Sequence, residues 1–191
     1  MNKKNLLLIA VFCIIAISQV HALGLGVQGN WYLSFEEEDK VDMGMDSFGF
    51  SVLVSPSRDL NFAGNYYFSR TSDVFGLTAD FCPQFLNFRL LGSGPTLLSN
   101  PSAWSFNFAI GLGGYVNVWV LYKDIDTKVD VGSIDVSGGF RFPIGFNLNL
   151  GGGLIEIFTH VAPSIGLYFA EGEEPFGNWF FPVALGVRIW L

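Results

Sequence analysis

The sequence predicts an all-β fold: an eight-stranded antiparallel up-and-down β-barrel that follows a cleaved N-terminal signal peptide. Three observations lead to this prediction. Apolar residues alternate with small or uncharged polar residues along most of the chain, as they do when side chains on a strand point to two faces. The composition combines 20 Phe and 23 Gly with only 14% charged residues, which favours strands over helices. The charged residues gather between the alternating segments.

The first 22 residues have the pattern of a secretory signal. Lys3 and Lys4 precede an apolar run, and Val20 and Ala22 offer small side chains at the two positions that a signal peptidase reads. A retained membrane anchor is disfavoured because the run is short for a span, and lipidation at Cys13 is disfavoured by the bulky Phe12 before it. We therefore expect a signal peptide at 1–22 and a barrel domain at 23–191.

The mature chain would keep a single cysteine, Cys82, so it contains no internal disulfide. Removal of Lys3 and Lys4 makes the formal charge of −7 more negative still. A chain this acidic is a poor ligand for nucleic acid, and we expect no nucleic-acid partner.

The first four alternating segments are 23–35, 47–55, 59–69 and 75–91. In the first, apolar residues such as Val27 alternate with polar ones such as Gln28. The second and third flank a tight turn whose backbone Pro56 presets. The fourth is less regular, and Pro83 with a change of phase near Phe85 predicts a bulge.

The remaining four segments are 103–122, 131–150, 154–169 and 181–191. Residues 90–122 carry no charge, so a transmembrane helix is the alternative there. Glycines and prolines interrupt this stretch and its apolar residues recur with period 2, which favours strands.

The less apolar face of these strands decides between two kinds of barrel. It consists of Gly, Ser, Asn, Ala and Gln with isolated charges, whereas the outside of a soluble barrel would carry many Lys and Glu. Such side chains suit the narrow interior of an eight-stranded barrel with lipid outside. The alternative is a soluble periplasmic lipocalin-like carrier. We also expect interfacial girdles among Trp31, Trp104, Trp119, Trp179, Trp190, Tyr66, Tyr122 and Tyr168.

Charged residues concentrate between predicted strands one and two, five and six, and seven and eight, which places them at one end of the barrel. With the N-terminus in the periplasm, that end faces outward. The candidate surface-loop residues are Glu36, Glu37, Glu38, Asp39, Asp124, Asp126, Glu171, Glu173 and Glu174.

The final segment alternates apolar residues up to the C-terminus: Val183, Leu185, Val187, Ile189 and Leu191. It resembles the C-terminal signature by which assembly machinery recognises bacterial outer-membrane β-barrel proteins, although the usual last residue is aromatic. The whole mature chain is similar in architecture to small barrels of the OmpX-like, OmpW-like and PagP-like class. This resemblance implies long outer loops, short inner turns, a location in the cell outer membrane, and outer-membrane lipid and the barrel assembly machinery as partners. We expect a monomer.

Five residues on the polar face are candidates for a charge network in the lumen: Arg89, Arg141, Glu156, His160 and Arg188. Buried charges are costly unless they are paired, so these residues are expected to fill the lumen and fix barrel closure. Some small barrels are lipid-modifying enzymes, and His160, Ser164 and Glu156 are the available groups. They lie four residues apart along one strand, about 13 Å, which exceeds hydrogen-bond reach.

The sequence predicts no catalytic residue, no metal site and no cofactor. Residue His160 is the only histidine of the mature chain, so a histidine metal cluster is excluded. The expected function is a structural or surface-interaction role through acidic extracellular loops, with no ligand specified. The alternatives are a narrow conduit for small or hydrophobic molecules, with a lateral exit near Pro163, a lipid-modifying enzyme and the soluble carrier.

Overall fold

The computed structural model describes residues 23–34, 47–68, 72–92, 102–122, 131–170 and 172–191. The predicted signal peptide and most of the predicted acidic loop residues lie outside these ranges. The strands are β1 (Gly24–Ser34), β2 (Ser47–Ser55), β3 (Leu60–Phe68), β4 (Ser72–Phe81), β5 (Asn87–Gly92), β6 (Ser105–Ile110), β7 (Leu112–Tyr122), β8 (Val131–Arg141), β9 (Ile144–Leu150), β10 (Ile155–Val161), β11 (Ser164–Phe169) and β12 (Phe176–Trp190).

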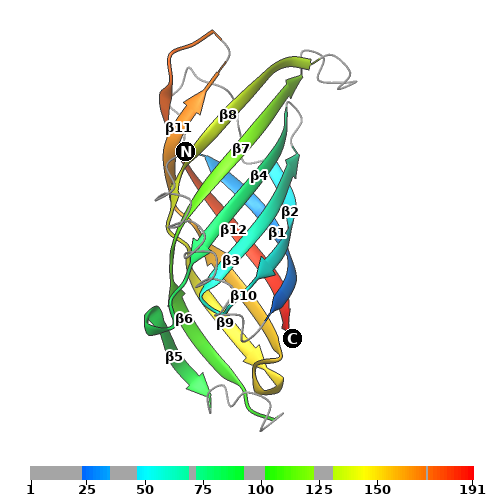
Figure 1. The fold of residues 1–191 in the computed structure, drawn as a ribbon, viewed down its shortest axis with the longest axis vertical. Helices are drawn as coiled ribbons and strands as arrows, with labels where there is room; N and C mark the ends of the chain where they lie inside the picture. Colours follow the sequence, from blue (N-terminus) through cyan, green and yellow to red (C-terminus); the bar gives the residue numbers. More distant parts are fainter. Residues whose placement is uncertain (1–22, 35–46, 69–71, 93–101, 123–130, 171) are drawn as a thin grey trace, which may run out of the picture.

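The strands form a closed antiparallel ring in the order β1-β2-β3-β4-β7-β8-β11-β12, with β12 pairing back onto β1 (Figure 1). The long strand β12 pairs with β11 near its start and with β10 near its end. The pairs β10/β11, β8/β9 and β6/β7 are therefore halves of single barrel strands. The predicted eight-stranded up-and-down barrel is confirmed.

The interruptions of the barrel strands lie in one row across the wall. Neighbouring backbones remain joined there: Gly111 N–H donates to Pro143 O at 2.8 Å, Phe142 N–H to Pro163 O at 2.9 Å, and Ala162 N–H to Pro182 O at 2.9 Å. Proline has no N–H to donate, so in each case only its carbonyl takes part. The row of strand breaks bends the wall, but backbone hydrogen bonds keep neighbouring strands joined at these three places.

The row ends at β4, where Cys82 N–H donates to Asp59 O at 2.7 Å. Beyond it the chain makes a short 3₁₀ turn, Gln84–Leu86, and enters β5, which pairs only with β6. The pairing shifts register between Arg89 and Leu91. The irregularity predicted near Pro83 is therefore present. Strands β5, β6, β9 and β10 form a flap that continues below the turn between β2 and β3 (Figure 1).

The two faces of the wall differ as the sequence predicts. Apolar side chains point outward and are exposed, for example Leu77 at 69% and Phe140 at 66%, while Asn30, Ser51 and Ser137 are fully enclosed. The enclosed polar groups satisfy one another: Asn30 Nδ2 donates to Ser51 Oγ at 2.6 Å, and Ser51 Oγ to Asn65 Oδ1 at 2.6 Å. A soluble carrier would have the opposite arrangement, so that alternative is wrong.

The side chains predicted to form aromatic girdles divide between the two faces of the wall. Residues Trp31, Trp104 and Trp179 are exposed on the outside, whereas Trp119 and Trp190 are buried in the lumen. The inward side chains have polar partners there: Trp119 Nε1 donates to Ser137 Oγ and Trp190 Nε1 to Glu156 Oε2. Tyr168 is also inside. The alternation of side chains along a strand determines which aromatic residues point inward. Each inward residue lies on the same strand face as enclosed polar neighbours.

The described residues contain no helix long and apolar enough to cross a membrane. Where it is described, the uncharged stretch 90–122 forms strands β5, β6 and β7, as predicted.

The two ends of the barrel are distinct. We call the end where β1–β2, β3–β4, β7–β8 and β11–β12 connect the loop end, and the opposite end, with Gly24 and Trp190, the turn end. The predicted acidic segments all belong to the loop end. The resemblance implied long connections at the loop end and short ones at the turn end. The turn-end connection between β5 and β6, residues 93–104, is nevertheless longer than the loop-end connection between β3 and β4, residues 69–71. This longer connection belongs to the flap, since it joins the flap strands β5 and β6.

The outward orientation of the apolar face predicts the effect of one added charge. The exposed Leu77, near the middle of β4, is expected to contact lipid. Leu77→Arg should lower the free energy of unfolding in lipid vesicles by about 2–4 kcal/mol, the cost of arginine near the bilayer midplane. Leu77→Ala is the control and should cost less. Denaturant titration in vesicles measures both; equal stabilities would contradict the membrane orientation.

Candidate functional site

Buried aromatic side chains close the lumen near the loop end. One packed cluster contains Tyr67, Val74, Tyr115, Trp119, Tyr168 and Phe180. In the ring, β3 stands opposite β11 and β4 stands opposite β12, so Tyr67 and Tyr168 come from facing walls, as do Val74 and Phe180. Their contact within one cluster means that side chains cross the whole lumen at this level. The hydroxyl of Tyr168 also donates to Asp135 Oδ2 at 2.8 Å.

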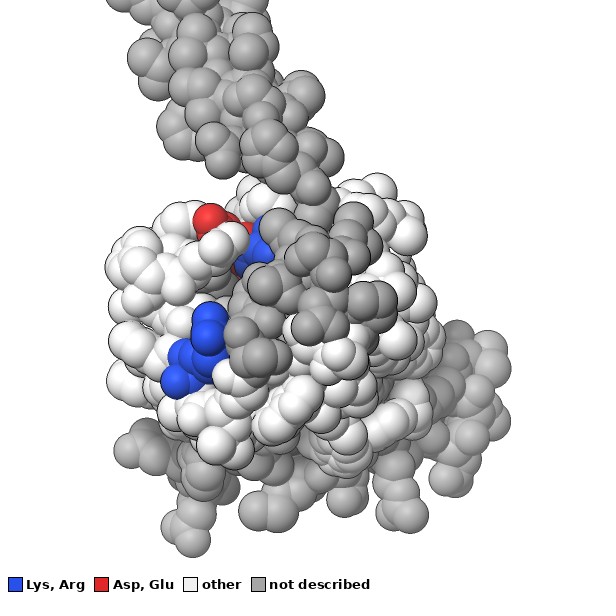
Figure 2. Space-filling view, turned by 90° about the horizontal axis from the view of Figure 1, so that it is seen from below, with Lys and Arg blue, Asp and Glu red and all other residues white. Residues whose placement is uncertain are grey.

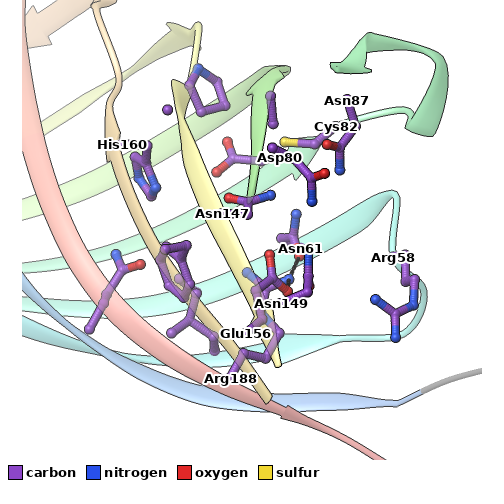
Figure 3. A pocket seen from close by; sticks show the side chains of 18 of the residues that line it. Arg58, Asn61, Asp80, Cys82, Asn87, Asn147, Asn149, Glu156, His160 and Arg188 are labelled. Atoms are coloured by element: carbon purple, nitrogen blue, oxygen red, sulfur yellow. Dashed lines mark hydrogen bonds and ion pairs between the residues drawn. The ribbon is translucent and has the colours of Figure 1, made fainter. Parts of the chain in front are cut away.

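A cavity of about 210 Å³ occupies the lumen toward the turn end. Its wall combines the row of strand breaks, represented by Cys82 and Pro143, with side chains from the flap. Figure 2 views the barrel from the turn end; among the described residues in view, basic and acidic side chains lie near one another with uncharged residues beside them. Figure 3 shows the labelled side chains converging on this space from opposite strands.

One charged group of the cavity centres on Arg141, the last residue of β8. Its Nε lies 3.2 Å from Asp80 Oδ1 of β4, and its Nη2 donates to His160 Nε2 at 3.3 Å. His160 stacks parallel to Phe158, with ring centroids 5.9 Å apart. Because Arg141 is only 4% exposed, its charge depends on these partners rather than on water.

A second charged group centres on Arg188 of β12. Its Nη1 donates a short hydrogen bond to Asn61 Oδ1 of β3 and lies 3.8 Å from Glu156 Oε2 of β10. The same carboxylate oxygen accepts from Trp190 Nε1 at 2.8 Å. The guanidinium of Arg188 also lies over the rings of Phe158 and Trp190, an arrangement that favours a cation.

Arg58, in the turn between β2 and β3, closes the edge of the cavity. Its Nη2 donates to Gly153 O at 2.9 Å, and its guanidinium lies 4.7 Å from the centre of the Trp190 ring. Burial lowers the pKa of the Arg58 guanidinium, and the Glu156 carboxylate opposes that shift. The group stays protonated at neutral pH because an ordinary arginine pKa lies above 12.

The structure brings together four of the five predicted lumen residues in these two groups: Arg141 with His160, and Arg188 with Glu156. The fifth, Arg89, lines the cavity on the exposed part of β5 and has no hydrogen bond or ion pair among the described residues. Sequence reasoning missed Asp80, Asn61 and Arg58. The sequence did contain a signal for Asp80, since this single acid lies on the same strand face as the small residues Gly76 and Thr78. No sequence pattern pointed to Arg58, which lies in a turn.

The proposed triad for a lipid-modifying enzyme is not assembled. The hydroxyl of Ser164 donates to Ala162 O at 2.8 Å, His160 contacts Arg141, and Glu156 contacts Arg188 and Trp190. A nucleophile must lie within hydrogen-bond reach of its base, and Ser164 has a different partner. Among the described residues no group of three or more His, Cys, Asp or Glu side chains is arranged to hold a metal ion.

The closed ring, the apolar outside and the polar lumen define a membrane-spanning β-barrel of the outer-membrane type. No protein-family model and no curated protein matches the chain. Among solved structures, the neisserial surface protein A (NspA) superposes with a TM-score of 0.54 at 12% identity, covering 88% of this chain and 97% of that one. The predicted class, a small outer-membrane β-barrel, is confirmed as the fold.

Two further solved structures align with lower scores. The attachment invasion locus protein Ail of Yersinia pestis gives a TM-score of 0.43 at 12% identity, covering 89% of this chain and 98% of that one. The N-terminal β-barrel domain of Pseudomonas aeruginosa OprF gives a TM-score of 0.33 at 13% identity, covering 88% and 97%.

The buried pair Arg141–Asp80 predicts a non-additive mutational effect. Arg141→Gln leaves the Asp80 carboxylate buried without its cation and should cost about 3–5 kcal/mol of stability. The double variant Asp80→Asn/Arg141→Gln removes both charges and should recover most of that loss. Denaturant unfolding of the wild type, both single variants and the double variant completes the cycle. Additive losses would show that the two groups are not coupled.

Proposed function

We propose that the protein is a non-conducting outer-membrane barrel whose acidic loop end makes contacts outside the cell. The observation that carries this proposal is the aromatic cluster that crosses the lumen beneath the loop end. A barrel closed at this level offers its environment a surface rather than a passage. Small outer-membrane barrels expose their longer loops to the outside, and on this ground we place the loop end outside the cell.

The charge of the loop end supports a contact role. The segment 35–46 contains Glu36, Glu37, Glu38, Asp39, Asp42 and Asp46 against one lysine. Glu173 and Glu174, between β11 and β12, are exposed. Such a concentration of one sign attracts partners of the opposite sign over about one Debye length, ~10 Å at 0.1 M salt. We therefore propose a positively charged partner.

The alternative conduit has less support. A path through the lumen would have to displace Trp119, Tyr168 and Phe180, each no more than 3% exposed. A lateral exit near Pro163 would open between β10 and β11, where Ala162 N–H bonds to Pro182 O and Phe142 N–H to Pro163 O. A molecule that takes the lumen route must first displace packed side chains, and one that takes the lateral route must first break backbone hydrogen bonds.

Conductance tests the closed lumen. Protein expressed from the full chain, purified from membranes and placed in planar lipid bilayers should give no ionic current steps. The triple variant Trp119→Ala/Tyr168→Ala/Phe180→Ala removes much of the cluster and should conduct, provided that it keeps the heat-dependent gel shift of a folded barrel. Wild-type steps as large as those of the triple variant would exclude the closed lumen.

Adhesion tests the acidic loop end. Cells that display the full chain should bind polylysine-coated surfaces better than cells without it, and binding should fall as salt is raised because exposed charges are screened. Replacing Glu36, Glu37 and Glu38 by Gln and Asp39 by Asn should abolish most of this difference. Asp59→Asn, which removes an acid from the turn end, is the matched control and should change nothing. Binding that survives the loop replacements would refute the proposed contact surface.

A further inference from the structure

The turn-end cavity has an excess of positive charge in an acidic protein. Four arginines line it, Arg58, Arg89, Arg141 and Arg188, against two carboxylates, Asp80 and Glu156. The chain as a whole has a formal charge of −7. Electrostatic attraction in a cleft is stronger than on an open surface because its low-dielectric walls focus the field. The cavity therefore attracts anions, in contrast to the loop end.

The two buried arginines are incompletely paired. Arg141 and Arg188 are only 4% and 6% exposed, and the enclosed Nε atom of each makes no hydrogen bond to any residue that the structure describes. Arg141 Nε is close to Asp80 Oδ1 but outside hydrogen-bond geometry. An arginine has five N–H donors, and such donors are almost always satisfied when buried. Unused donors on two buried cations favour an additional acceptor in the cavity.

The rest of the lining suits a polar organic molecule rather than a bare ion. Five asparagines, Asn61, Asn87, Asn107, Asn147 and Asn149, border the cavity, and each amide can donate and accept. The enclosed Asn87 Oδ1 has no hydrogen-bond partner in the described part of the chain. The volume of about 210 Å³ lies below the ~300–1,000 Å³ of drug-sized ligand pockets, which indicates a small ligand.

We propose that the turn-end cavity binds a small organic anion through a carboxylate or phosphate group. Arg141 and Arg188 hold the anionic group, since a guanidinium binds such groups with paired N–H donors, and the asparagines hold the polar remainder. Arg89, exposed and without a partner among the described residues, attracts the anion into the mouth. The aromatic cluster closes the far side, so the ligand enters and leaves from the turn end. This binding role is separate from the contacts proposed for the loop end.

Calorimetric titration of the detergent-solubilised full-length protein tests the proposal. The probes are inorganic phosphate for the phosphate group, citrate for carboxylates and glucose as a neutral polar molecule. Saturable binding of phosphate, citrate or both, with none of glucose, is expected; preference for one anion identifies the group recognised. Binding of neither anion, or equal binding of glucose, would overturn the proposal.

Three variants that each remove one charge test whether the anion binds in this cavity. The test therefore does not depend on a single substitution that could prevent folding. Arg89→Gln breaks no described contact and should weaken anion binding by about tenfold, the loss of one charged contact. Asp80→Asn removes a competing carboxylate and should tighten binding. Arg70→Gln, which removes an arginine between β3 and β4, is the matched control and should leave affinity unchanged. A retained gel shift verifies folding, and equal affinities in the wild type and all three variants would place any bound anion outside this cavity.

Discussion

The structure depends on backbone hydrogen bonding in a medium that offers none. In the hydrocarbon of a bilayer, each peptide N–H and C=O needs a partner within the protein, and a ring closed by β1 on β12 provides it without exposed edges. The row of breaks obeys the same constraint. At Pro143, Pro163 and Pro182 one donor is missing, yet each proline carbonyl accepts from its neighbour, so the wall bends without opening. Below the row, the flap strand β10 still pairs with β12 of the ring, whereas β5 pairs only with β6.

Closing eight strands leaves a lumen too narrow to remain empty, and this chain fills it in two different ways. Near the loop end, aromatic side chains from facing walls belong to one buried cluster. Toward the turn end, where the strands break and the flap begins, the filling is polar and incomplete. The charges there are arranged in two groups around Arg141 and Arg188, each with a carboxylate from another strand. The Glu156–Arg188 pair stabilises the register of the neighbouring strands β10 and β12, and the Asp80–Arg141 pair joins β4 to β8 across β7. A shift by one residue would turn these groups outward.

The same chain presents opposite charges at its two ends. Acidic residues concentrate in the segments joined to the loop end, whereas Arg58, Arg89, Arg141 and Arg188 surround the turn-end cavity. The aromatic cluster lies between them and separates the two environments. The proposed function, in which this cluster closes the lumen, treats the two ends as independent surfaces. The fold by itself favours neither function, since one barrel serves many roles.

The sequence by itself determined the barrel. Alternation such as that of Val27 with Gln28 identifies the strand faces. The small and polar inner face, with only isolated charges, indicates the surrounding medium, and the position of acids such as Glu36 indicates the ends, because each of these depends only on local periodicity and composition. It also placed Arg141, Glu156, His160 and Arg188 on the inner face. Only the tertiary structure decided their partners, since Asp80 and Asn61 reach them from strands far away in the chain, and strand register across the lumen is not encoded locally. The cavity beside the proline row likewise arises from how neighbouring strands pack, which no single segment specifies. The inward orientation of Trp119 and Trp190, by contrast, follows strand parity, which the sequence contains.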